Sequence, residues 1–279
     1  GYDAGVAHRK NPPATRIKIK EETMTINIGQ SERTTQNRVV ALFCEKLGYR
    51  YLGNLQGLAN KNIREADLLA WLAKRGVSDA LAQSAVKSLQ DLNHLGGGRR
   101  LYDANGDIYQ LLRYGAKVKM GVGEQTQTVW LVDWENPQNN DFSVAEEVSI
   151  PGSQYDKRPD VVLYLNGIAV AVLELKRSSV SVSEGIRQNI ANQQREFCET
   201  FFTTVQLLFA GNDSEGLRYG VIETPEKYYL KWKEDGAPDN LGDLDADLSH
   251  VCEKSRFLEI LHDFMVFDNG AKKTCRPNQ

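Results

Sequence analysis

The sequence predicts an α/β fold, in which helices flank a mixed central β-sheet and an α-helical addition precedes the sheet. Three observations lead to this prediction. Apolar residues recur at helical spacing as far as residue 115. Short segments rich in β-formers, separated by Gly, Asn and Pro, follow from residue 117. Two such segments are joined by Asn166 and Gly167, the strongest two-residue signal for a hairpin.

The N-terminal half is predicted to be helical. Residues 1–23 have no clear amphipathic period, so we interpret them as a tail or leader and exclude them from the fold. Ser31 is a helix cap, Val39 and Phe43 lie on one apolar face, and Gly48 ends the helix. The region 61–115 continues with helices over 65–74, 78–92 and 101–114, with a glycine break at 96–98.

Strands are predicted next, over 117–120, 128–134 and 142–150. The hairpin takes 161–165 and 168–176, and a helix over 183–200 leads to strands at 205–210 and 217–222. A short last strand is expected within 227–233. Residues 233–248 are rich in Asp, Gly and Asn and predict a loop, after which a helix over 255–267 is expected to open a different unit. The predicted main domain is therefore 24–234, with 235–279 outside it.

Composition narrows the class of protein. A chain of 279 residues with 41% hydrophobic residues can bury one good core. Its four cysteines lack the spacing of a zinc site or a disulfide framework, and no apolar run approaches the roughly 20 residues that cross a bilayer. We therefore expect a cytoplasmic protein with no membrane partner. The net charge of −3 means that any DNA site must be a local basic patch.

The residues with the strongest chemical signal are Asp160, Glu174 and Lys176, at the ends of the predicted hairpin strands. Phosphodiester hydrolysis needs a cation, an activated water and a positioned donor, and Mg²⁺ prefers one or two carboxylates. Strand alternation places Glu174 and Lys176 on one face. The backbone carbonyl of Leu175 is a further candidate metal ligand.

A strict two-residue hairpin does not bring these carboxylates together. If Leu165 opposes Ile168, Asp160 opposes Leu173 and faces away from Glu174. We expect a bend or bulge at Pro159 and Asp160 to restore the match. The alternative interpretation is that these residues are ordinary charges at strand ends. No P-loop, HExxH or GxSxG motif offers a rival chemistry.

Arg158, Pro159 and Asp160, followed by the VLELKR sequence of 172–177, resemble the PD-(D/E)xK nuclease core. More specifically, the chain is similar to the restriction (R) subunit of Type I restriction enzymes. The helix from Ser31, the strand over 206–212 and the segments 264–273 and 276–279 extend the similarity from residue 31 to the last residue. The resemblance implies a restriction-endonuclease-like core in 24–234. It also implies that 235–279 is a linker and the start of a helicase or translocase motor, most of which is missing.

The same resemblance implies site residues. Asp160 and Glu174 would hold Mg²⁺, with Mn²⁺ as a substitute, and Lys176 would polarise the attacking water. Gln188 would be the glutamine of the QxxxY element, although Asn192 replaces its tyrosine and Gln193 with Phe197 offers the same spacing. Further acids are candidates for an accessory role in metal binding: Glu32, Glu146 and Glu147.

The expected function is Mg²⁺-dependent cleavage of double-stranded DNA, without sequence readout of its own. We expect Lys157, Arg158 and Arg177 to contact the DNA. The resemblance implies methylation and specificity subunits as partners, and ATP binding only in the missing motor. Two alternatives remain open at this point: another PD-(D/E)xK nuclease, such as a repair exonuclease or a resolvase, and a non-catalytic module that docks DNA or subunits.

Overall fold

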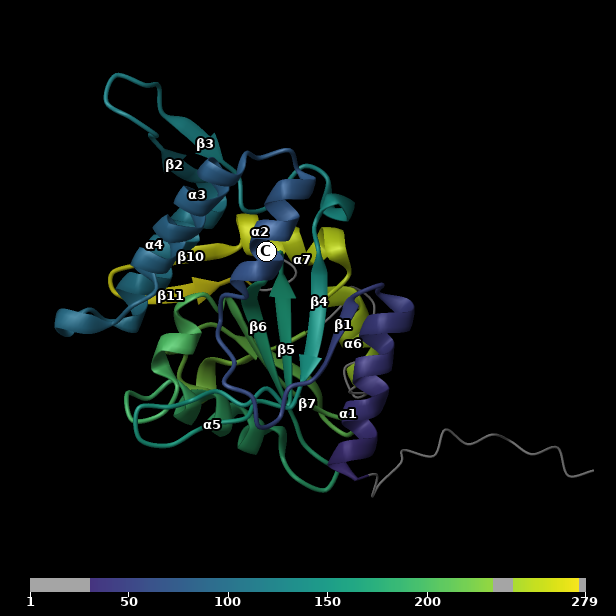
Figure 1. The fold of residues 1–279 in the computed structure, drawn as a ribbon. Helices are drawn as coiled ribbons and strands as arrows, with labels where there is room; N and C mark the ends of the chain where they lie inside the picture. Colours follow the sequence, from purple (N-terminus) through teal and green to yellow (C-terminus); the bar gives the residue numbers. More distant parts are fainter. Residues whose placement is uncertain (1–30, 233–242, 276–279) are drawn as a thin grey trace, which may run out of the picture.

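The computed structural model describes residues 31–232 and 243–275, and the predicted fold class is confirmed. A seven-stranded mixed sheet has the order β1-β4-β5-β6-β7-β8-β9, with helices on both faces (Figure 1). Strands β1 and β4 run parallel, as do β6 and β7, and the other neighbours are antiparallel. The strands of this sheet are β1 (Arg50–Asn54), β4 (Phe142–Glu146), β5 (Val161–Leu165), β6 (Ile168–Leu175), β7 (Leu207–Asn212), β8 (Gly216–Gly220) and β9 (Leu230–Lys231).

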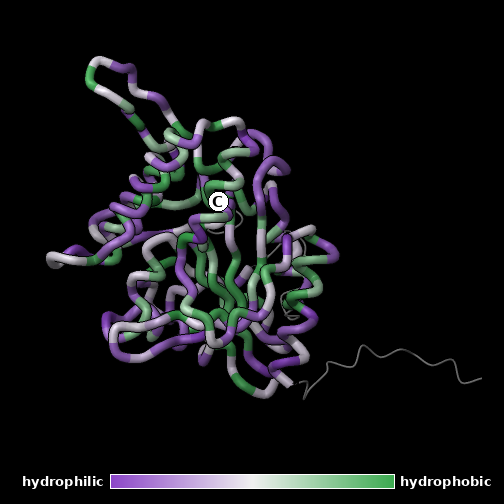
Figure 2. The backbone as a smooth tube through the Cα atoms, in the orientation of Figure 1, coloured by the Kyte–Doolittle hydropathy of each residue, from purple (hydrophilic) through white to green (hydrophobic). Residues whose placement is uncertain are grey.

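The helices divide between the two faces of the sheet. The α-helices are α1 (Glu32–Ala41), α2 (Glu65–Lys74), α3 (Asp79–Leu92), α4 (Leu101–Tyr114), α5 (Val182–Asn192), α6 (Leu244–Val251) and α7 (Lys254–Asp263). Helix α5 packs on β6 and β7 with the apolar residues of one core cluster, whereas α1, α6 and α7 share the other cluster. The strands between these layers are the most hydrophobic part of the chain, as Figure 2 shows.

The predicted N-terminal helices are confirmed. The Ser31 side chain accepts a hydrogen bond from the Thr34 amide, which caps α1, and the helix continues as a π-helical turn over Leu42–Lys46. Helices α2, α3 and α4 occupy the region predicted to be helical, with a kinked turn at Gly96–Gly98 between the last two. Strand β1 was not predicted, because it is short and partly exposed.

The predicted hairpin of β5 and β6 is also confirmed. Asn166 (φ 52°) and Gly167 (φ 84°) both have positive φ, as a type I′ turn requires, and Leu165 pairs with Ile168. A Cβ atom at Gly167 would lie 2.7 Å from the Arg64 carbonyl oxygen, so the close contact with the start of α2 also requires glycine.

The predicted position of the bulge was wrong. The register shifts within β6, because Leu163 pairs with Ala171 while Tyr164 pairs with Ala169, and Val170 is left without a partner in β5. The irregularity therefore lies in the second strand and not at Pro159 and Asp160. Beyond it Val161 pairs with Leu173, which puts Asp160 opposite Glu174.

The helix predicted over 183–200 ends at Asn192. The residues after it form a loop whose backbone pairs with another loop: the amides of Ser153 and Gln154 donate to the carbonyls of Phe197 and Glu196. This tertiary pairing, followed by the 3₁₀ turn Glu199–Thr203, replaces the last helical turns.

Several strand predictions were also too long or misplaced. The strand predicted over 142–150 ends at Glu146. Strands β2 (Ala116–Val118) and β3 (Gln127–Val129) form their own two-stranded sheet, which projects from the body at the upper left of Figure 1. The chain turns away after Val129, so most of 128–134 is not a strand. The strand predicted within 227–233 shortens to two residues of β9.

The C-terminal segment differs from the prediction in two places. Residues 244–251 form α6, because Asp243 caps the helix and acidic residues in its first turn favour its N-terminus. The next helix, α7, ends at Asp263, and β10 (Met265–Asp268) pairs with β11 (Ala271–Thr274). Phe257 and Leu261 of α7 join the same hydrophobic cluster as the central sheet. The domain boundary at residue 234 stays a prediction, while 1–23 and the first part of the predicted loop over 233–248 lie outside the described residues. Among those described, no helix has the length and apolar character needed to cross a membrane.

Candidate active site

The two carboxyl groups singled out in the sequence meet on one face of the sheet. Asp160 precedes β5, and Glu174 is the penultimate residue of β6. Because of the register shift, both are in phase with Val162 and Val172, which belong to the cluster under α5. The Asp160 Oδ2 atom accepts a hydrogen bond of 2.7 Å from the Leu175 amide. The shift at Val170 thus produces the convergence that a regular hairpin would prevent.

Burial dominates the electrostatics of this pair. Asp160 is 9% exposed and Glu174 is 0% exposed. Burial raises the pKa of Asp160 to about 6, although the Leu175 amide and the charge of Lys176 act in the opposite direction. Burial and the neighbouring Asp160 carboxyl raise the pKa of Glu174 well above its usual range. Without a cation the pair therefore retains protons where free carboxyl groups would lose them.

One oxygen of this pair has no partner among the described residues. The Asn192 amide donates to Glu174 Oε1 at 3.1 Å, while Glu174 Oε2 is buried without a hydrogen bond. A buried, unpartnered carboxylate oxygen costs free energy unless a proton or a cation compensates it. The site thus fits a hard cation such as Mg²⁺, which needs only one or two carboxylates. No cluster of three or more His, Cys, Asp or Glu side chains able to hold a metal occurs in the described part.

Lys176 and Glu32 complete the charged groups at this end of the sheet. The Lys176 Nζ atom lies 3.4 Å from Glu32 Oε1, and Glu32 is 43% exposed while Lys176 is 12% exposed. Glu32 also raises the pKa of both Asp160 and Glu174, after the larger effects of burial. The structure therefore brings together four of the predicted site residues, from the start of α1 and from β5 and β6.

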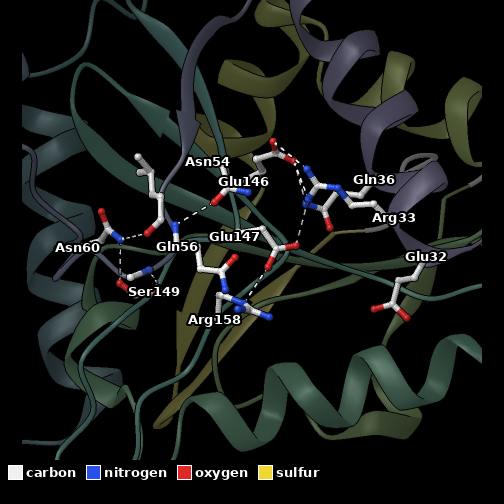
Figure 3. A network of polar contacts seen from close by, with 12 residues as sticks. Glu32, Arg33, Gln36, Asn54, Gln56, Asn60, Glu146, Glu147, Ser149 and Arg158 are labelled. Carbon is white, nitrogen blue, oxygen red and sulfur yellow. Dashed lines mark hydrogen bonds and ion pairs between the residues drawn. The ribbon is translucent and has the colours of Figure 1, made fainter.

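Glu146 and Glu147, at the end of β4, form a second acidic pair nearby (Figure 3). Glu146 pairs with Val161 and so faces the opposite side of the sheet from Asp160. Its carboxylate accepts hydrogen bonds from Gln36 (2.9 Å) and Tyr51 (2.7 Å). Burial and this carboxylate raise the pKa of Tyr51 to about 12, which keeps the phenol a donor.

Two arginines surround Glu147. Arg158 Nε lies 2.8 Å from Glu147 Oε2, and Arg33 Nη1 lies 3.4 Å from Glu147 Oε1 and 3.3 Å from Glu146 Oε2. Glu147 itself has a φ of 51°, an uncommon conformation for a residue other than glycine. Its amide donates to the Asp160 carbonyl at 2.9 Å, so this backbone segment supports the start of β5.

The three predicted DNA contacts are in different situations. Arg158 is half exposed and bound to Glu147, and Arg177 is exposed directly after Lys176. The Lys157 ammonium lies 3.9 Å from the centre of the Phe197 ring, a cation–π contact. Their role in DNA binding stays a prediction.

The two candidates for the QxxxY glutamine differ in their surroundings. Gln193 is buried, donates to the Asn189 carbonyl and accepts from the Glu223 amide, so its side chain is occupied in the fold. Gln188 is partly buried and lies one helical turn before Asn192, on the same side of α5. The QxxxY spacing that starts at Gln188 ends at Asn192, which contacts Glu174, whereas the spacing that starts at Gln193 does not include this residue.

Sequence reasoning missed the roles of Arg33, Gln36, Tyr51 and Asn192. Arg33 and Gln36 are three residues apart in a strongly capped helix, a spacing that places them on one face. The sequence could therefore have predicted that Arg33 and Gln36 contact the same partner. Tyr51 is on the strand that was not predicted, so nothing in the sequence indicated its contact.

Comparison with known proteins gives a consistent result. Residues 29–227 match the model of the family described as "Type I restriction enzyme R protein N terminus". The "Putative type I restriction enzyme MjaIXP endonuclease subunit" of Methanocaldococcus jannaschii is 23% identical over 287 aligned residues, covering 90% of this chain and 27% of the relative. The "Type I restriction enzyme HindI endonuclease subunit" of Haemophilus influenzae is 29% identical over 211 residues, covering 71% and 20% respectively. The chain thus spans about a quarter or less of the length of these relatives. It belongs to the family of N-terminal regions of Type I restriction enzyme R subunits, whose relatives are named as endonuclease subunits.

Proposed function

We propose that this domain hydrolyses phosphodiester bonds of double-stranded DNA with the help of Mg²⁺, which Mn²⁺ can replace. The observation that carries the proposal is the pair of buried carboxyl groups of Asp160 and Glu174, one of which has an oxygen without a partner beside Lys176. Burial of two adjacent acids lowers the stability of the fold, and groups kept at such a cost are concentrated at functional sites.

In this proposal Asp160, Glu174 and the Leu175 carbonyl hold the metal ion. When bound, the cation supplies positive charge at the phosphate and at the attacking water. The Leu175 amide fixes the orientation of Asp160 through its hydrogen bond of 2.7 Å. The ammonium group of Lys176 forms an ion pair with Glu32 in this structure. In the proposed reaction it orients the water or the phosphate, whether or not this ion pair is kept.

Arg158 and Arg177 are proposed to bind the DNA backbone next to this centre, with Lys157 at the edge. In the sequence, Lys157 and Arg158 come shortly before Asp160, and Arg177 comes shortly after Glu174. Recognition of a DNA sequence, methylation and ATP-driven translocation are proposed to belong to partner subunits and to the remainder of the longer protein. The names of the relatives support an assembly of this kind.

The test is calorimetric titration of Mn²⁺ into the wild-type chain and into Asp160→Ala and Glu174→Ala. We expect binding in the wild type and its loss in both variants. Asp91→Ala is the control, since Asp91 is an exposed helix residue paired with Lys87. Binding that persists in both site variants, or is absent from the wild type, would favour the non-catalytic docking module.

Cleavage of DNA distinguishes the nuclease alternatives. The proposed endonuclease nicks or cuts a closed circular duplex, whereas a repair exonuclease requires an end and a resolvase prefers a junction. Activity on linear or branched DNA alone would replace the endonuclease proposal with one of these two.

A further inference from the structure

We propose that Asn192 is a positioning residue, which holds the Glu174 carboxylate so that one of its oxygens remains available to the metal ion. This inference rests on the proposed function, because it assigns Glu174 to a metal site. Asn192 is 1% exposed and donates from Nδ2 to Glu174 Oε1 at 3.1 Å. The other oxygen, Oε2, is the one without a partner.

Close packing of α5 on the sheet brings Asn192 within reach of Glu174. Gly185 allows the approach: a Cβ atom there would lie 3.2 Å from the Ala210 Cβ, 3.4 Å from the Glu174 carbonyl oxygen and 3.5 Å from the Glu174 Cβ. The helix therefore contacts β6 at the level of Glu174 itself. Asn192 is the last residue of α5, about two turns later.

The end of α5 is fixed by contacts that do not involve the carboxylates. Asn189 donates from its side chain to the Phe209 carbonyl at 2.8 Å, and the Asn192 carbonyl accepts from the Cys198 amide at 3.1 Å. Because the backbone on both sides of Asn192 is tied down, its amide group has a defined place. It can therefore restrict rotation of the Glu174 carboxylate.

The group that receives the hydrogen bond separates this role from simple stabilisation. Asn192 Oδ1 and Asn189 Oδ1 are both buried without partners in the described structure, so an unsatisfied amide oxygen does not distinguish the two residues. The difference is that Asn189 donates to a backbone carbonyl, whereas Asn192 donates to the carboxylate whose second oxygen, Oε2, has no partner. Asn192 thus makes one directed contact with Glu174 Oε1 and leaves Oε2 available to the proposed cation.

The experiment measures Mn²⁺ affinity by calorimetry for Asn192→Ala and Asn192→Leu. Leucine has the same number of side-chain heavy atoms as asparagine, branched at the same carbon, and no donor; although it is bulkier, it leaves no cavity and so separates loss of the hydrogen bond from loss of packing. Loss of an outer partner of a metal ligand typically weakens metal binding about 10- to 100-fold, and we expect a decrease in this range. At saturating metal we expect kcat to fall while KM for DNA stays constant, because DNA contacts are not altered.

Asn189→Ala is the matched control, since Asn189 is a buried amide one turn earlier that binds only backbone. It should lower Tm and weaken Mn²⁺ affinity much less than Asn192→Ala does, because the contact of the Cys198 amide with the Asn192 carbonyl remains. Gln194→Ala, an exposed change at the end of the same helix, should alter neither. Circular dichroism establishes that each variant is folded before titration.

The outcomes keep the two proposals apart. Wild-type affinity in both Asn192 variants, with binding lost in Glu174→Ala, would overturn the role of Asn192 and leave the metal site intact. Equal weakening by Asn189→Ala would also overturn it, because the effect would then come from general loosening of α5. If the wild-type chain bound no Mn²⁺, the proposed function would fail and the role of Asn192 would fail with it.

Discussion

The domain contains two pairs of buried or half-buried carboxyl groups on adjacent strands, and they are built in opposite ways. Glu146 and Glu147, at the end of β4, are surrounded by donors: two arginines, an amide and a phenol. Asp160 and Glu174, at the ends of β5 and β6, have one backbone amide, one side-chain amide and a lysine that is shared with Glu32. The protein compensates the negative charge of Glu146 and Glu147 with donors, and it leaves the charge of Asp160 and Glu174 largely uncompensated.

This difference distinguishes an acid whose charge the fold compensates from one whose charge it leaves uncompensated, and it does so more clearly than burial does. Glu146, at 6% exposure, is more buried than Asp160, at 9%, yet donors surround it, whereas burial without such a set of donors raises the pKa of Asp160 and Glu174. A buried acid with a complete set of donors stabilises the fold around it. A buried acid with an unfilled acceptor is stable only with a proton or a cation, which is a useful property for a metal ligand.

The largest effect is expected for Glu174→Gln. The amide removes the buried acid but cannot replace the carboxylate as a metal ligand, so kcat/KM for cleavage should fall by about 1,000-fold or more. The same change should raise the stability of the metal-free domain by about 1–3 kcal/mol, because no proton must be retained at neutral pH. Thermal unfolding in EDTA and DNA cleavage measure the two effects. If Glu174→Gln instead lowered the stability of the metal-free domain, the charge of Glu174 would be compensated by the protein, as that of Glu146 is, and the proposed difference between the two acidic pairs would be wrong.

The next effect is the pH dependence of stability in the absence of metal. The pKa of Asp160 rises from 3.8 to about 6 on folding, so the folded state binds the proton more tightly. Its contribution to stability is therefore fully present below about pH 4 and is lost as the pH rises to about 6, an effect of about 3 kcal/mol. Denaturant unfolding in EDTA between pH 4 and 7 measures it. Asp160→Asn should remove this part of the slope, and identical slopes in the two proteins would contradict the assignment.

The smallest of these effects is expected for Glu146→Gln. The amide keeps one acceptor oxygen but presents an NH₂ group in place of the other, so that either Gln36 or Tyr51, together with Arg33, meets a second donor. The cost should be about 1–3 kcal/mol of stability, while Mn²⁺ affinity should not change, because Glu146 faces the other side of the sheet. Chemical denaturation and calorimetry give the two numbers. Weaker metal binding would instead support Glu146 as a third acid.

Local signals in the sequence predicted much of this fold. The capping serine of α1, the helical periods of α2 to α4 and the turn at Asn166 and Gly167 are all set by neighbouring residues, and all are confirmed. The pairing of Asp160 with Glu174 could also be anticipated, since the hairpin joins the two strands that carry them. These features depend on interactions within one helix or one hairpin.

The features that were missed depend on distant parts of the chain. The shift at Val170 lies in a run of small and β-branched residues that reads as regular alternation, so its position is decided by packing on both faces. The early end of α5 follows from pairing between two loops. The contact of Asn192 with Glu174 requires both that early end and the close approach at Gly185.

The unpaired residue in β6 has a consequence for how relatives of this chain should be aligned. Because of the extra residue between the turn and Glu174, the side chains of β6 beyond Val170 face α5 in the opposite alternation to that of a regular strand. In a homologue without this residue, an acid at the same number of positions after the turn would face the other side of the sheet. An alignment that places no gap near Val170 would then equate the Glu174 carboxylate with a core leucine. The spacing between the aspartate and the glutamate is therefore a poor guide to common ancestry unless the position of this single residue is known.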